Sequence, residues 1–151
     1  MNILVSACML GVSCRYDGTG MLQEVLKNKM GRYNFIPICP EQLGGMETPR
    51  QASERVGAKI ISKVGEDVTH NFARGASETL KIAKLYGCDY AILKERSPSC
   101  GYGEIYDGTF SGGLTTGNGV TAELLENHKI TVIGESKIEE MFRKFEGDLL
   151  K

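Results

Sequence analysis

Three of the five cysteines in this 151-residue chain come after short apolar runs. These are Cys8, Cys39 and Cys100, and the runs that precede them are NILVSA, FIPI and YAIL. Runs of this length, bounded by glycine, proline and polar residues, are typical of buried β-strands. Thiolate sulfur is a ligand that soft metals and iron–sulfur clusters prefer. Three thiols at three strand ends therefore indicate a metal centre.

The number of these cysteines bears on the kind of centre. A structural metal site is closed by four protein ligands, whereas three ligands leave one position open for a substrate, which favours catalysis. The alternative is that all three are ordinary core cysteines, because cysteine is among the residue types most often buried. The odd total argues against a disulfide framework, so we expect free thiols in a reducing, cytoplasmic compartment.

The other two cysteines are expected to differ from these three. Cys88 precedes the YAIL run, which places it at the opposite edge of a sheet, and we interpret it as a structural thiol. Cys14 lies six residues after Cys8 in a loop flanked by glycines, so it is the alternative ligand. No pair has C-x-x-C spacing and both histidines, His70 and His128, fall on predicted helices, which makes a zinc finger a poor interpretation.

Strand-like and helix-like segments alternate along the chain. We predict strands at 2–7, 35–38, 58–64, 90–93 and 130–133, and helices at 21–30, 69–86, 121–127 and 136–145, with Thr69 and Ser136 as N-caps. Residues 42–55 read as an irregular loop, and 101–119, which hold seven glycines, as an ordered loop over the site that acts as a lid. This order predicts a single α/β domain over residues 1–151, with a mainly parallel sheet between helices on both faces in a Rossmann-like, three-layer arrangement.

That architecture explains how distant cysteines can meet. In open α/β sheets, ligands bind in the crevice beyond the carboxyl ends of the strands. Side chains just past three parallel strands therefore share one small volume whatever their separation in sequence. The same geometry fits a small-molecule site.

Charge and hydropathy exclude several classes of partner. Eighteen Lys and Arg residues nearly balance nineteen Asp and Glu residues, so no overall positive field favours nucleic acid or an anionic membrane surface. No stretch approaches the roughly 20 apolar residues of a membrane-spanning helix. The sequence is compatible with either a monomer or a dimer.

An ordered set of motifs resembles the thiouracil desulfidase family. It consists of SACMLG (6–11), RYDG (15–18), CPE (39–41), GG (44–45), TPR (48–50), LK (93–94), SPSCG (97–101), YDGTFSG (106–112) and GVTA (119–122). The resemblance runs from about residue 2 to residue 133. Met9 stands where the family more often has leucine, a swap of similar volume.

The resemblance implies a cofactor and a reaction. It implies a 4Fe–4S cluster held by Cys8, Cys39 and Cys100, with an open iron that takes sulfur from a small thiolated pyrimidine such as 2-thiouracil and releases it as hydrosulfide. The product is the oxo base. Two alternatives stay open: a non-enzymatic metal or cluster module, and a desulfidase for thiolated nucleosides of RNA, which the near-neutral charge disfavours.

Replacing C=S by C=O requires a base that activates water and a group that supplies a proton. Glu41 lies two residues from Cys39 and is the candidate base, the alternative being a loop salt bridge with Arg50. Ser97, three residues before Cys100, is the candidate for proton transfer or for holding the ring, the alternative being a turn-capping hydroxyl. Ser99 is a weaker candidate for substrate binding.

Three cations complete the candidate site. We expect these cations to balance the charge of a thiolate-bound centre or to polarise the oxygen of a substrate. They are Arg15, Lys94 and Arg50. The alternative is that these long side chains are solvated at the sheet edge.

Overall fold

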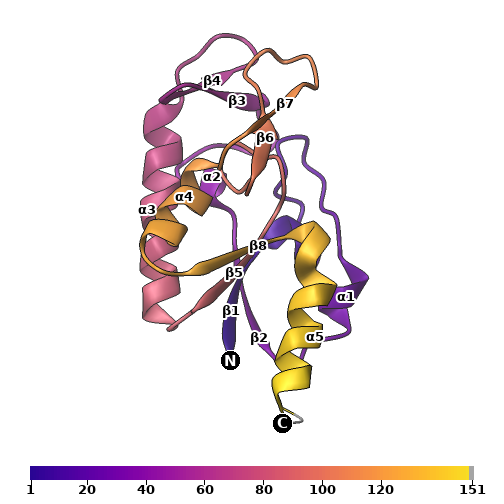
Figure 1. Ribbon diagram of the computed structural model, residues 1–151. Helices are drawn as coiled ribbons and strands as arrows, with labels where there is room; N and C mark the ends of the chain where they lie inside the picture. The colour runs from indigo at the N-terminus through magenta and orange to yellow at the C-terminus, as the bar shows by residue number, and fades with distance from the viewer. Residues whose placement is uncertain (150–151) are drawn as a thin grey trace.

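The computed structural model describes residues 1–149, and a four-stranded parallel sheet lies at its centre (Figure 1). The strand order is β2-β1-β5-β8, and the strands span Asn34–Ile38, Asn2–Ser6, Tyr90–Leu93 and Thr131–Gly134. The predicted strands at the first, second, fourth and fifth positions are therefore confirmed within a residue or two. Pro37 lies in β2, at the edge of the sheet, where a missing N–H donor is tolerated.

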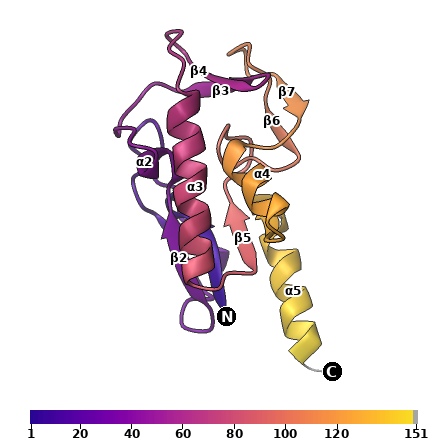
Figure 2. The ribbon, with the colours of Figure 1, turned by 90° about the vertical axis from the view of Figure 1, so that its left-hand side faces the viewer.

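Helices cover both faces of this sheet, which confirms the predicted three layers (Figure 1). Short α1 and terminal α5 lie on one side, and α3 and α4 lie on the other. These helices span Glu24–Lys27, Ile138–Leu149, Thr69–Leu85 and Val120–Asn127. Figure 2 shows α3 running along the full height of the sheet.

Alternation along the strands divides the core into two layers, because successive side chains of a strand point to opposite faces. Ile3 and Val5 of β1 pack with Phe142 of α5, whereas Leu4 packs with Leu125 of α4 and Ala83 of α3. Both layers are fully buried at the level of β1 and β5. The central strands are therefore fixed on both faces, and so are the positions of their carboxyl ends.

Short elements lie around the carboxyl edge of the sheet. They are the 3-10 helices η1 (Ala7–Leu10) and η2 (Glu135–Lys137), the single-turn helix α2 (Pro40–Leu43), and the hairpins β3 (Ser53–Val56) with β4 (Lys59–Ser62) and β6 (Glu104–Tyr106) with β7 (Leu114–Thr116). Both hairpins sit beyond the strand ends (Figures 1 and 2). The predicted strand at 58–64 pairs with β3 in its own two-stranded sheet.

Three predictions about local structure were wrong in part. The segment 42–55 is not wholly irregular, since it contains the end of α2 and the start of β3, and 101–119 contains a hairpin. The predicted helix at 21–30 is reduced to α1, because the amides of Met21 and Gln23 donate to the carbonyls of Cys8 and Met9 and hold this stretch extended.

Neither predicted N-cap acts as one. Thr69 is the first residue of α3, and its hydroxyl accepts a hydrogen bond from the amide of Ile60 in β4. Ser136 lies in η2, where its amide and hydroxyl donate to Glu95. Both side chains therefore form hydrogen bonds with residues distant in sequence instead of capping a helix. Among residues 1–149, no helix is long and apolar enough to cross a membrane.

Candidate active site and metal centre

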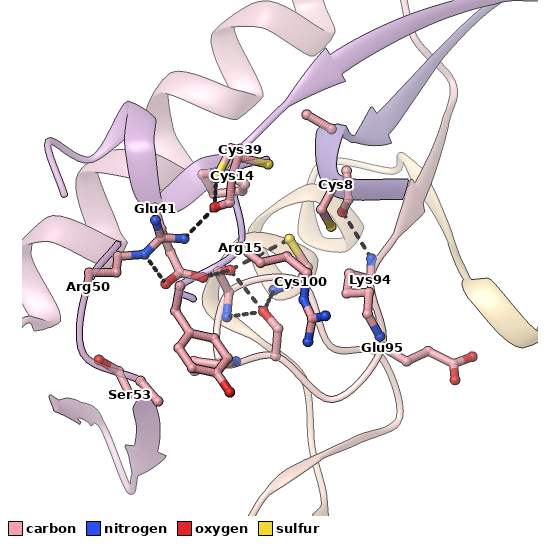
Figure 3. Close-up of a pocket in the computed structure, with 18 of the residues that line it drawn as sticks. Cys8, Cys14, Arg15, Cys39, Glu41, Arg50, Ser53, Lys94, Glu95 and Cys100 are labelled. Carbon is pink, nitrogen blue, oxygen red and sulfur yellow. Dashed lines mark hydrogen bonds and ion pairs between the residues drawn. The ribbon is translucent and has the colours of Figure 1, made fainter. Parts of the chain in front are cut away.

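A cavity of about 270 Å³ opens at the carboxyl edge of the sheet, between the loops that follow β1, β2 and β5. Four of the five cysteines line it: Cys8, Cys14, Cys39 and Cys100 (Figure 3). Nine residues were proposed from the sequence as ligands, catalytic groups or substrate-binding groups, and all nine line the cavity. Besides Cys8, Cys39 and Cys100 they are Arg15, Glu41, Arg50, Lys94, Ser97 and Ser99. Cys88 does not, and it packs in the core with Ala83 and Ile130.

The parallel pairing of the strands explains this convergence. Ser6 of β1 lies opposite Ile38 of β2, so Cys8 and Cys39 both leave the sheet at the same height. Cys8 lies in η1, and Cys39 is the residue before α2. Strand β5 pairs with the other side of β1, and its C-terminal loop carries Cys100. The predicted shared volume beyond the strands is therefore present.

A tight turn positions Cys100. The hydroxyl of Ser97 accepts hydrogen bonds from the amides of Ser99 (3.1 Å) and Cys100 (2.9 Å). The start of α4 packs directly on this turn at Gly119, where a Cβ atom would lie only 2.4 Å from the carbonyl carbon of Ser99. Glycine is thus required at position 119, and the Ser97 hydroxyl has the turn-capping contacts that were its alternative interpretation.

Cys14 belongs to the same group of thiols. Its carbonyl oxygen accepts a hydrogen bond of 2.8 Å from Arg50, and the thiol of Cys39 lies 3.7 Å from that oxygen. The thiols of Cys39 and Cys8 both lie near enough to Cys14 to shift the pKa of its side chain. Figure 3 shows Cys14 beside Cys39, with Cys8 and Cys100 across the cavity.

The surroundings raise the pKa of three of these thiols, Cys14, Cys39 and Cys100. Desolvation raises the pKa of Cys100 to about 12, although the hydroxyls of Ser6 and Ser99 oppose the shift. The pKa of Cys39 is raised by its contact with the Cys14 thiol and by burial. The Cys39 contact lowers the pKa of Cys14, but the Cys8 contact and burial outweigh it, so the net shift is upward. A positive partner such as a metal centre would favour the deprotonation of these three thiols.

Glu41 is held by two residues from different loops. Its Oε1 accepts a hydrogen bond of 3.1 Å from Nε of Arg50, in an ion pair whose side chains are 16% and 5% exposed. Its Oε2 accepts a hydrogen bond of 3.2 Å from Ser99. The predicted alternative, a salt bridge with Arg50, is present, and the carboxylate also reaches the cavity.

Two serines extend this contact toward the cysteines. The hydroxyls of Ser97 and Ser99 lie 3.0 Å apart, and that of Ser99 lies 3.6 Å from the sulfur of Cys100. A continuous hydrogen-bonded chain therefore runs from Glu41 through Ser99 to Ser97. Proton transfer between water and a reacting group is the chemistry that such a chain can support.

The cations differ in how they are paired. Lys94 forms an ion pair with Glu135, so its charge is neutralised locally. Arg50 is paired with Glu41. Arg15 forms no ion pair within residues 1–149, and its side chain extends toward the region between Cys100 and Lys94 (Figure 3).

Further cavity residues were missed in the sequence. They are Tyr16, Ala52, Ser53, Glu54, Glu95 and Tyr106. Glu54 and its neighbours lie on β3, in a segment that reads as loop because SERV carries no apolar run. Tyr16 and Tyr106 fall within motifs of the family resemblance, which was the available signal for them.

The chemistry of the donor set fits an iron–sulfur cluster. Within residues 1–149, no three His, Cys, Asp or Glu side chains are placed to share one metal ion. A single zinc ion holds sulfur at about 2.3 Å, so its ligands converge on one point. Four cysteines line the cavity, and cysteine thiolates are the usual ligands of iron–sulfur clusters.

Comparison with known proteins places the chain in a family. A family model described as 2-thiouracil desulfurase matches residues 3–137. The uncharacterized protein YbbK of Bacillus subtilis (strain 168) is 43% identical over 149 residues, which cover 92% of this chain and 99% of that protein. A solved structure of the 4Fe–4S-dependent thiouracil desulfidase TudS has a TM-score of 0.90 at 39% identity and covers 96% of this chain and 97% of that one. The chain therefore belongs to the 2-thiouracil desulfurase family of enzymes.

Proposed function

We propose that this enzyme is an iron–sulfur-dependent desulfidase that converts the C=S group of a small thiolated heterocycle, such as 2-thiouracil, to C=O and releases hydrosulfide. One observation carries the proposal. Three strand-end cysteines and the hydrogen-bonded chain Glu41–Ser99–Ser97 line the same cavity. The similarity to TudS, which is described as 4Fe–4S-dependent, supports it.

Cys8, Cys39 and Cys100 are the proposed cluster ligands, one from the loop after each of three neighbouring strands. When bound, the cluster supplies an iron without a protein ligand, which acts as a Lewis acid toward the sulfur of the substrate. Cys14 lines the same cavity near Cys8 and Cys39 and remains the alternative ligand.

Glu41 is the proposed general base. Its Oε2 takes a proton from the water that attacks the thiocarbonyl carbon, so that the oxygen of the water becomes the new carbonyl oxygen. Arg50 fixes the carboxylate through Oε1 and leaves Oε2 directed to Ser99. Overall, the thiocarbonyl compound and water give the carbonyl compound and hydrogen sulfide, with no net oxidation or reduction.

Ser99 and Ser97 are the proposed path for the proton. The Ser99 hydroxyl contacts both Glu41 and the Cys100 sulfur, so it lies between the base and the proposed cluster site. The Ser97 hydroxyl extends the path by 3.0 Å. A proton taken up at Glu41 is thereby passed toward the departing sulfur.

Arg15 is the cation proposed to contact the substrate, since Lys94 and Arg50 already have carboxylate partners. A guanidinium at the cavity polarises an exocyclic oxygen and offsets the charge of thiolate ligands. Lys94 and Arg50 then act by holding the walls of the cavity.

A free small molecule is the proposed substrate. A cavity of about 270 Å³ has room for a single pyrimidine ring, and the nearly balanced charge of the chain offers no field for a phosphate backbone. All five cysteines are free, which fits a reducing compartment such as the cytoplasm.

The test is anaerobic reconstitution followed by an iron and sulfide count and an assay with 2-thiouracil. We expect about four irons per chain, a brown protein, and release of sulfide with formation of uracil. Protein that stays colourless after reconstitution, or loaded protein that releases no sulfide from any thiolated pyrimidine, contradicts the proposal.

A further inference from the structure

Glu54 is a buried carboxylate to which the proposed reaction gives no role. It lies on β3, in the wall of the cavity, and only 8% of its surface is exposed. It forms no ion pair with any residue in the described part of the chain. A carboxylate at such a depth is stable only where other donors satisfy it.

The two oxygens of Glu54 are used unequally. Oε1 accepts hydrogen bonds from the amides of Gly108 (3.0 Å) and Phe110 (3.1 Å), and so holds the turn of the β6–β7 hairpin against β3. Oε2 accepts no hydrogen bond from residues 1–149. Within residues 1–149, the side-chain oxygens that are fully buried and have no hydrogen-bond partner are the hydroxyls of Tyr33, Ser53 and Thr121. Oε2 of Glu54 is not one of them. Oε2 is therefore accessible to solvent, on a side chain that lines the cavity, and no residue of 1–149 donates a hydrogen bond to it.

The other carboxylates around the cavity accept hydrogen bonds from protein groups or point elsewhere. Both oxygens of Glu41 accept hydrogen bonds from protein groups. Glu95 bonds to Ser136, and Figure 3 shows its carboxylate pointing away from the cysteines. The side chains of Arg15 and Lys94 are donors only, and the serine and tyrosine hydroxyls of the lining accept hydrogen bonds but carry no charge. Glu54 is thus the carboxylate left to recognise a donor on a ligand.

We infer that Oε2 of Glu54 accepts a hydrogen bond from a ring N–H of the substrate, an inference that rests on the proposed function. Glu54 is then a specificity-determining residue. It selects thiolated heterocycles that keep an N–H beside the thiocarbonyl, and it disfavours those alkylated at the ring nitrogens. A hydrogen bond to a charged acceptor contributes about tenfold to a hundredfold in binding.

Glu54→Gln separates this role from the anchoring of the hairpin. The glutamine side chain keeps a carbonyl oxygen for the amides of Gly108 and Phe110, but it presents an NH₂ group to the cavity. The NH₂ group of the glutamine and the ring N–H of the substrate are then both donors, so no hydrogen bond forms between them. The matched control is Glu104→Gln, which changes an exposed carboxylate on β6.

The experiment compares 2-thiouracil with 1,3-dimethyl-2-thiouracil, which has no ring N–H, on cluster-loaded protein. For the wild-type enzyme we expect a KM at least tenfold higher for the dimethyl compound. In Glu54→Gln the KM for 2-thiouracil rises by a similar factor, kcat changes less than threefold, and the preference between the two substrates disappears. Glu104→Gln keeps the wild-type preference. Hydrogen exchange at Gly108 and Phe110 stays at the wild-type rate in both variants, which excludes a loss of the anchor.

A preference between the two substrates that is the same in wild type and Glu54→Gln overturns the inference. Calorimetric binding of uracil and 1,3-dimethyluracil gives a second measurement that needs no sulfur chemistry. If wild-type protein releases no sulfide yet prefers uracil in a way that Glu54→Gln abolishes, the proposed function fails and the role of Glu54 stands. If sulfide is released but neither preference depends on Glu54, the proposed function stands and the inferred role of Glu54 fails.

Discussion

The hydroxyl of Ser99 donates a hydrogen bond of 3.2 Å to Oε2 of Glu41. This bond joins α2, which follows β2, to the loop after β5, and these two strands lie on opposite sides of β1. It therefore connects two residues whose separation in sequence gives no hint of contact. It also makes the position of the proposed base dependent on the turn that carries Cys100.

Ser99→Ala should slow the reaction without removing the metal centre. The variant breaks the path between Glu41 and Ser97 but keeps the turn, because Ser97 still accepts the two amides. We expect kcat for sulfide release to fall about 10²-fold, at the lower end of the range for proton-transfer groups. Iron content and the absorption spectrum stay unchanged. Ser77→Ala, on the exposed side of α3, is the control, and a kcat equal to that control would remove Ser99 from the path.

Glu41→Gln should be the more severe substitution for catalysis. The amide keeps an oxygen for Arg50 but cannot take up a proton from water, so kcat falls by about 10²–10⁴. The iron count is the necessary companion measurement, since loss of the cluster would give the same loss of rate. A loaded Glu41→Gln enzyme within tenfold of the wild-type kcat would contradict the assignment of the base.

Arg50→Met should be severe for stability instead. It leaves the Glu41 carboxylate largely buried without its cation, and breaking a buried pair in this way costs about 3–5 kcal/mol of the free energy of unfolding. The double variant Glu41→Gln with Arg50→Met leaves neither charge, so it regains part of that loss. Urea denaturation of the three metal-free proteins measures the difference. A double variant no more stable than Arg50→Met would mean that the hydrogen bonds of Arg50 to Cys14 and to the loop matter more than the charge.

Serine substitution should divide the cysteines into two sets. Cys8→Ser, Cys39→Ser and Cys100→Ser each remove a proposed ligand, so reconstituted protein binds well under four irons per chain. Cys14→Ser keeps the cluster if three ligands suffice, and Cys88→Ser is the control in the core. Iron and sulfide counts on anaerobic samples are the measurement. A Cys14→Ser protein that fails to bind iron would make Cys14 the ligand in place of one of the three.

The sequence was sufficient for the sheet and for most of the site. Apolar runs such as residues 2–7 form central strands because both faces must be buried, and the carboxyl ends of parallel strands meet by necessity. Cys8, Cys39 and Cys100 were placed together by that rule alone. The position of Cys88 in the core followed from its place before β5.

What the sequence missed depends on contacts between distant segments. The helix predicted at 21–30 is shortened by backbone hydrogen bonds to η1, and no local propensity encodes them. The sequence offered Cys14 only as an alternative ligand, and its place beside Cys39 involves a hydrogen bond from Arg50, in a different loop, to its carbonyl oxygen. Glu54 lies on a strand whose pattern is half polar, and its partners are amides of the β6–β7 turn. Such partners become visible only in three dimensions.

The buried thiol of Cys100 should give the metal-free protein a characteristic loss of stability at high pH. Its pKa is raised to about 12 by burial, whereas an unfolded cysteine has a pKa of about 8.5. Below about pH 8.5 the thiol is protonated in both the folded and the unfolded chain, and its contribution to the free energy of unfolding is fully present. Between about pH 8.5 and 12 the unfolded chain loses the proton and the folded chain keeps it, so stability falls as pH rises. Cys100→Ala should flatten this slope relative to wild type, because the other groups that titrate in the range are common to both proteins.

Metal loading should reverse this fall of stability with pH, since cysteine must lose its proton to bind metal and affinity therefore increases with pH. Urea denaturation at several pH values measures both slopes, and equal slopes for wild type and Cys100→Ala would show that the thiol is not protonated by its burial.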